Sequence, residues 1–144
     1  MENRHRATAV ALLAGVLAFS ALQLLQFLLA QFTSLHPTAL MDPQPYPAWS
    51  HIAQQILSAV QLVGPALLAG WLAKHSGILV GAATGVFGSI GGLAVLTLLI
   101  GPDYLKTFEP AWVFGVLVYA IIPSAVGGVA GVALREWAAA RSQR

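Results

Sequence analysis

Charged residues and cysteine are what this sequence has least of. Only 8% of its 144 residues are charged, against roughly 25% in an ordinary soluble domain. The chain has no cysteine, which excludes disulfides, thiolate zinc sites and cysteine nucleophiles. Seven Lys and Arg against five Asp and Glu give a net charge of +2. That charge is too small and too scattered for a nucleic-acid surface, so no nucleic-acid partner is expected.

Apolar residues take the place of the missing charges. They make up 58% of the chain, and the mean hydropathy is +0.77. A soluble domain cannot hide so much apolar surface from water, and a disordered chain does not carry it. The composition therefore predicts an integral membrane protein with a single domain over residues 1–144, in contact with membrane lipid.

The few charges bracket four uncharged runs. A helix needs about 20 apolar residues to cross the hydrocarbon layer, and each run is long enough. Backbone groups find no hydrogen-bond partner in lipid, so these runs must be helical. We predict an all-α bundle of four transmembrane helices over residues 7–32, 50–73, 77–100 and 111–134.

Basic residues predict the orientation of these spans. With four spans, Lys106 falls on one side and six basic residues fall on the other: Arg4, Arg6, Lys74, Arg135, Arg141 and Arg144. Loops rich in Lys and Arg stay in the cytoplasm. We therefore expect both termini to be cytoplasmic, in a bacterial or archaeal cytoplasmic (inner) membrane.

Two segments of the chain resemble each other. Pro37-Thr-Ala-Leu40 is followed by Pro47-Ala-Trp49, and Pro102-Asp-Tyr-Leu105 is followed by Pro110-Ala-Trp112. An Ala-Gly pair also precedes a basic residue by the same spacing at the end of each following helix. We interpret the chain as two tandem hairpins, residues 7–74 and 77–135, related by an axis along the membrane normal. The Pro-Ala-Trp match alone would also fit a common way to start a helix at an interface.

Small residues follow helical spacing in the last two spans. They let helix backbones approach closely, which is how helices associate in lipid. In the third span a stripe resembling a glycine zipper comprises Gly77, Gly81, Gly85 and Ser89, with Gly88 and Gly92 beside it. In the fourth span the small residues are Ala120, Ser124 and Gly128, with Gly127 and Gly131. The spacing leaves open whether the partner helix belongs to the same chain or to another.

Amide and hydroxyl side chains gather on the first two spans, on one face of each helix and at similar depth. They are Gln23, Gln26, Gln54, Ser58 and Gln61. They fit an interhelical hydrogen-bond network, which we favour, because glutamine commonly joins membrane helices in this way. They also fit one wall of a polar path.

Proline interrupts two of the spans. Pro65 and Pro123 each remove the hydrogen bond to the carbonyl four residues earlier, so both helices are expected to kink. Interrupted helices in the two halves of a repeat can mark a transport site. Proline is also frequent in membrane helices without that role.

The spans contain few side chains that could act in catalysis or proton transfer. No Asp, Glu, Lys or Arg lies deep in any of them, so neither a proton relay nor general acid–base catalysis has an obvious agent. The four histidines, at 5, 36, 51 and 75, lack metal-ligand spacing. We expect no enzyme activity, no metal and no cofactor.

Two function classes remain in competition. The first is a non-catalytic membrane protein, either a self-associating bundle (a homo-oligomer) or an accessory subunit packed against other membrane subunits. The second is a small homo-oligomeric channel or carrier for a small solute, with a Gln/Ser-lined path. The glycine stripe and the lack of ionisable groups favour the first, whereas the amides and the interrupted helices favour the second.

The orientation predicts a labelling pattern. A cysteine introduced at Gln44 should react with a membrane-impermeant reagent added outside intact cells, because the first loop is predicted to be external. Cysteines at Ser76 and Ser142 should react only after the membrane is opened. Labelling of Ser76 from outside would contradict the four-span topology.

Overall fold

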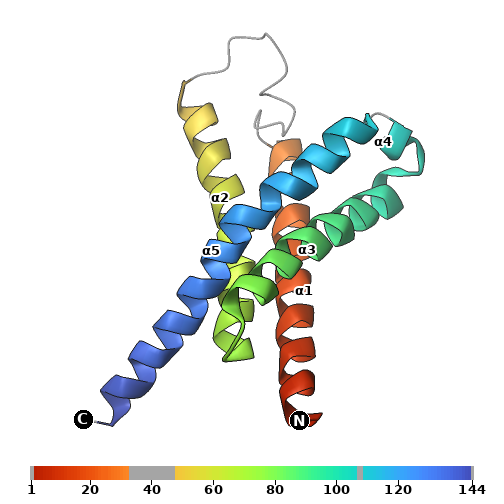
Figure 1. Ribbon diagram of the computed structural model, residues 1–144. Coiled ribbons are helices and arrows are strands. Elements are labelled where there is room, and N and C mark those ends of the chain that lie inside the picture. Colours follow the sequence, from red (N-terminus) through yellow and green to blue (C-terminus); the bar gives the residue numbers. More distant parts are fainter. Residues whose placement is uncertain (1, 33–47, 107–108, 144) are drawn as a thin grey trace.

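The computed structural model describes residues 2–32, 48–106 and 109–143, and within these ranges every regular element is a helix (Figure 1). Four helices are long and apolar enough to cross a membrane, as predicted. A short fifth helix, α4, lies between the third and fourth of these. The elements are α1 (Glu2–Phe32), α2 (Ala48–Ala73), α3 (Gly77–Ile100), α4 (Asp103–Lys106) and α5 (Pro110–Ser142).

The helices extend past the predicted spans at the two ends of the chain. α1 begins at Glu2 rather than at residue 7, and α5 continues beyond residue 134 to Ser142. At 1.5 Å per residue α1 is about 47 Å long and α5 about 50 Å long. Both exceed the hydrocarbon thickness of about 30 Å. A helix need not end where its lipid contact ends, and the alanines near the end of α5 favour helix.

The turn between α2 and α3 is short and has unusual backbone geometry. It consists of Lys74, His75 and Ser76, and both Lys74 (φ 67°) and Ser76 (φ 56°) adopt the left-handed conformation that normally favours glycine. The amide of Val80 donates to the carbonyl of Ser76 at 3.0 Å, which ties the turn to α3. So short a connection makes α2 and α3 antiparallel neighbours.

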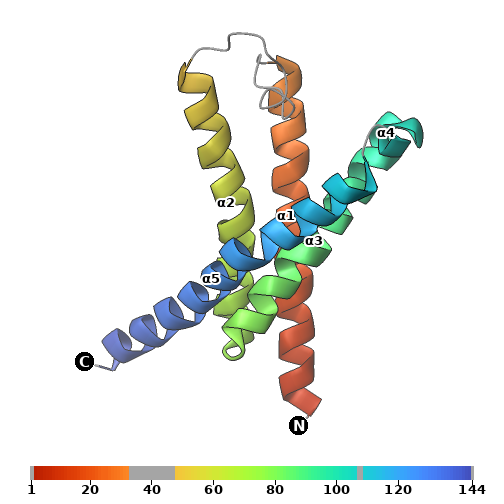
Figure 2. The same ribbon diagram turned by 45° about the horizontal axis from the view of Figure 1, so that its top comes forward.

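The helices alternate in direction, so the start of α1, the α2–α3 turn and the end of α5 lie at one end of the molecule (Figure 1). α1 packs on α2 and α3, α5 packs on the same two helices, and α2 also touches α3. The α3–α5 pair crosses the α1–α2 pair obliquely in both ribbon views (Figure 2). α2 and α3 are therefore central, and α1 and α5 flank them.

The core between the helices is narrow and built from small side chains. Its buried apolar members are Ala11, Phe19, Ala66, Ala69, Ala73, Val80, Leu96 and Ala120. The large aliphatic residues lie mostly on the outside, which is the reverse of a soluble protein. Such a core lets helix backbones come close together, and this closeness positions the residues described next.

The predicted tandem duplication stays a prediction. Its first loop motif, at residues 37–40, lies outside the described residues. The interhelical contacts of the two halves differ in kind: α3 meets α5 through glycine, whereas α1 and α2 share an amide hydrogen bond.

Candidate functional site

The glycine stripe of α3 faces α5 at backbone distance. A Cβ atom added to Gly77 would lie 2.6 Å from the carbonyl oxygen of Gly128, and one added to Gly85 would lie 2.5 Å from Ser124 Oγ. A Cβ on Gly81 would overlap the carbonyl of Ser124, and one on Gly128 would overlap the carbonyl of Gly77. No residue larger than glycine fits these places without a shift, so the stripe is filled by a helix of its own chain.

The second glycine pair of α3 faces α1 instead. A Cβ on Gly88 would lie 2.5 Å from Phe19 Cγ, and one on Gly92 would overlap the side-chain oxygen of Gln23. Ser89, beside this pair, is buried and donates to the carbonyl of Gly85 at 2.8 Å. The small residues of α3 therefore form two contact faces, one for α5 and one for α1.

α5 presents two faces as well, because it lies between α2 and α3. Ala120, Ser124 and Gly128 meet α3. Gly127 meets α2, where an added Cβ would lie 2.6 Å from the carbonyl oxygen of Val63, and Gly131 meets α2 at the carbonyl of Leu67. The row of Gly127 and Gly131 thus contacts α2, whereas the row of Ala120, Ser124 and Gly128 contacts α3 and also reaches α2.

Ser124 joins the two faces of α5. Its side chain is fully buried, and its Oγ donates to the carbonyl of Leu62 on α2 at 2.9 Å. The same Oγ lies against Gly85 of α3. This hydroxyl of α5 thus touches two other helices, α2 and α3. Its hydrogen bond satisfies a donor that would be costly to leave unpaired in this core.

One amide of α1 and one amide of α2 meet inside the spans. Gln61 Nε2 donates to Gln23 Oε1 at 3.3 Å, and Gln23 packs over Gly92, so α1, α2 and α3 converge there. Gln26 and Ser58 are half-buried, and the side chain of Gln54 lies outside the described residues. Of the four predicted polar side chains that the structure describes, it therefore brings together one pair.

Two further hydroxyls inside the spans bond within their own helix. Thr84 Oγ1 donates to the carbonyl of Val80 at 2.8 Å, and Thr97 Oγ1 donates to that of Leu93 at 2.7 Å. Thr84 is fully buried and also touches the position where a Cβ on Gly15 would lie. Sequence reasoning missed Thr84, although it stands one residue before Gly85 in the stripe.

The two prolines lie inside continuous helices. α2 runs through buried Pro65 to Ala73, and α5 runs through half-buried Pro123 to Ser142. Proline has no N–H, so the carbonyls of Gln61 and Tyr119 lose their usual helical donor. The kinks stay a prediction.

A cationic contact at the end of α2 was also missed. Arg135 Nη1 donates to the carbonyl oxygen of Trp71 at 3.0 Å. Trp71 is in the last turn of α2, where carbonyls have no helical partner, so Arg135 caps that helix. Nothing in the spacing of two residues 64 positions apart predicts this bond.

Among the described residues, no three His, Cys, Asp or Glu side chains come close enough together to hold a metal ion. The polar contacts of the spans instead join helix to helix or a hydroxyl to its own helix.

Comparison with known proteins returned no match from the family models, the curated proteins or the solved structures.

The backbone contact at Gly128 predicts a stability difference between two glycines of α5. Gly128→Ala should lower the free energy of unfolding by about 1–3 kcal/mol, because its methyl group overlaps Gly77. Gly115→Ala is the control, since no atom lies within 4 Å of its added Cβ. It should be neutral or raise stability by up to about 1 kcal/mol. Unfolding titrations in detergent micelles would measure both, and equal values would contradict the packing.

The amide pair predicts a coupling between its two members. Gln23→Leu and Gln61→Leu should each destabilise the fold. The double variant should cost less than the sum by about 0.6 kcal/mol, the average for such bonds in membranes, and by no more than about 1.7 kcal/mol. A double-mutant cycle on unfolding free energy gives this coupling. Strictly additive effects would mean that the two amides do not interact.

Proposed function

We propose that the protein is a non-catalytic integral membrane protein that works by association, either as a self-associating helical bundle or as an accessory subunit of a larger membrane complex. The proposal rests on the contacts that the small and polar residues of the spans make. Gly81, Ser124 and Gln61 all serve contacts between helices of the same chain. The apolar exterior is then the surface offered to the surroundings.

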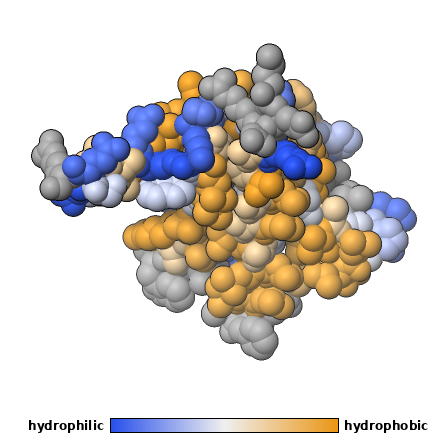
Figure 3. Space-filling view, turned by 90° about the horizontal axis from the view of Figure 1, so that it is seen from below, coloured by the Kyte–Doolittle hydropathy of each residue, from blue (hydrophilic) through white to orange (hydrophobic). Residues whose placement is uncertain are grey.

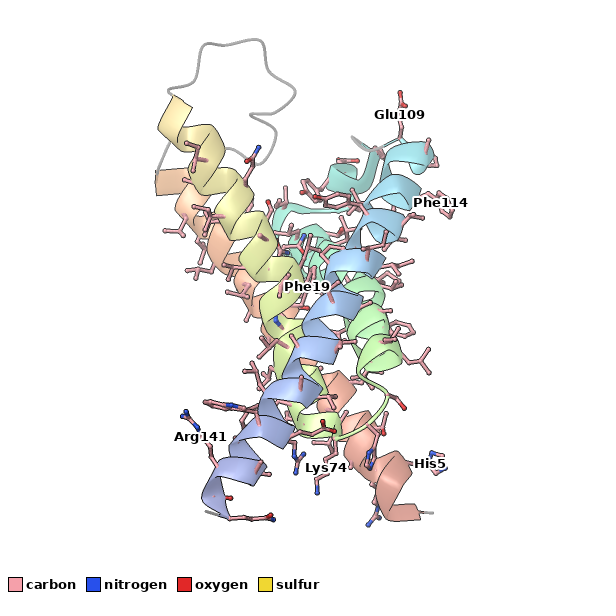
Figure 4. All side chains as sticks on the ribbon, turned by 60° about the vertical axis from the view of Figure 1, so that its left-hand side comes forward. His5, Phe19, Lys74, Glu109, Phe114 and Arg141 are labelled. Carbon is pink, nitrogen blue, oxygen red and sulfur yellow. The ribbon has the colours of Figure 1, made fainter. Side chains whose placement is uncertain are left out.

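The exterior of the spans consists of large apolar side chains. Leu98 is 86% exposed, Ile122 73% and Leu79 72%. Figure 4 shows Phe114 of α5 directed away from the other helices. Water cannot cover surfaces of this kind, so lipid or other membrane helices must cover them.

The glycine contacts limit which surfaces of the protein could bind a second copy of the chain. Gly77, Gly81 and Gly85 already meet α5 of their own chain, so they offer no face to a second chain. Self-association would therefore use the larger side chains of the exterior, such as Phe114 and Ile122.

Charge supports the proposed orientation in the membrane. His5, Lys74 and Arg141 lie at the end that holds the termini, and Glu109 lies at the opposite end (Figure 4). A basic end faces the cytoplasm by the positive-inside rule. We propose cytoplasmic termini in a bacterial or archaeal cytoplasmic membrane.

A channel or carrier is the second candidate, and the Gln23–Gln61 pair is the observation that favours it. Two partly buried amides inside the spans could line part of a path. Four helices enclose little volume, so this function would require a homo-oligomer.

A paired assay of assembly and flux separates the two candidates. Assembly is measured as the mass of the particle extracted from the membrane, and flux as solute release from vesicles. If the role is association, Gln61→Leu should leave assembly unchanged, and vesicles with wild-type protein should release no more solute than empty ones. Wild-type flux that Gln61→Leu abolishes, with assembly unchanged, would refute the proposal and support the channel.

A further inference from the structure

A cavity of about 480 Å³ opens at the basic end of the molecule, between the end of α2 and the last turns of α5. Two cations, Lys74 and Arg135, line it together with Trp71 and Ser142. Ala138 and Ala139 of α5 also line the cavity, and their small side chains do not fill the space between the two helices. No carboxylate is among its lining residues, so the cavity is positively charged.

The two cations of the cavity differ in how the local structure positions them. Arg135 is held in place by its hydrogen bond to the Trp71 carbonyl, and its guanidinium keeps further N–H donors for a ligand. Lys74 is the residue with φ 67°, where the chain leaves α2 in the left-handed conformation. A lysine there is less favourable than glycine. Helix capping accounts for Arg135, and Lys74 places a second cation on the same wall.

Within the described part of the chain, neither Lys74 nor Arg135 forms an ion pair with an acidic residue. Among the described residues the ion pair is Lys106 with Asp103, whose Nζ and Oδ1 atoms are 2.6 Å apart in α4, near the other end of the molecule. Glu136 follows Arg135 in α5 but does not line the cavity. An anion from outside the chain would therefore complete the charge balance of the cavity.

Aromatic residues indicate the depth of this cavity in the membrane. Trp71 lines it, and Trp137, one turn before the end of α5, carries the guanidinium of Arg141 4.1 Å from its ring centroid. Tryptophan favours the level of the lipid headgroups. Seen from this end, hydrophilic residues follow the projecting end of α5, and hydrophobic residues cover much of the remaining surface (Figure 3).

We propose that this cavity binds the phosphate of an anionic phospholipid in the leaflet at the basic end. Lys74 and Arg135 would contact the phosphate, and Leu72 and the alanines would contact the apolar part of the lipid. Basic cavities between membrane helices bind such headgroups elsewhere. The inference depends on the membrane location but not on assembly or transport.

Lipid titration of the purified full chain tests the site. Native mass spectrometry would measure the affinity for phosphatidylglycerol and for phosphatidylcholine. Lys74→Gly removes the charge and suits the left-handed backbone, so this variant should fold at least as stably as the wild type. Its affinity for phosphatidylglycerol should fall about fivefold, the effect of one cation near a lipid surface. Arg141→Gln is the matched control, a cation of the same end outside the cavity, and should bind as the wild type does.

Three results would overturn the proposal. The first is equal phosphatidylglycerol affinity in Lys74→Gly and the wild type. The second is equal affinity of the wild type for phosphatidylcholine, which carries no net charge. The third is displacement of phosphatidylglycerol by millimolar inorganic phosphate, which would assign the cavity to a soluble anion.

Discussion

The close approach of helix backbones is the constraint on which the rest of this structure depends. Lipid is as apolar as the helices, so burying large side chains contributes little to their association, and packing must hold them together. Gly77 and Gly128 allow this approach because neither carries a Cβ atom, so the two backbones can touch. Their contact holds α5 against α3, while Gly127 and Gly131 hold it against α2. The same device, with Gly88 and Gly92, brings α1 onto the other face of α3.

This packing determines where the polar groups lie. Because α1, α2 and α3 converge at Gly92, Gln23 and Gln61 come within hydrogen-bond distance. Ser124 reaches α2 for the same reason, since α5 lies close to both neighbours. At the end that holds the termini, Arg135 caps α2 and lines a cavity together with Lys74. Polar groups thus lie at helix contacts and at the two ends of the molecule.

The sequence predicts the four spans well because its rare charges bracket them, and the bounds of α3 agree with the prediction. It does not predict which glycine meets which helix, because the spacing of Gly81 and Gly85 suits a partner in the same chain or another. The end of α5 at Ser142 was not predicted, since hydropathy marks the membrane segment and not the helix. The Arg135–Trp71 bond depends on the approach of α5 to α2, which no local pattern encodes.

The claim that the glycine faces pack within one chain has a direct test. The loss of stability caused by Gly128→Ala should be measured in lipid bilayers over a wide range of protein-to-lipid ratios. A contact within one chain does not depend on concentration, whereas a contact between chains weakens on dilution. The structure predicts the same destabilisation at every ratio. A loss of stability that disappears as the protein is diluted would show that these glycines join separate chains.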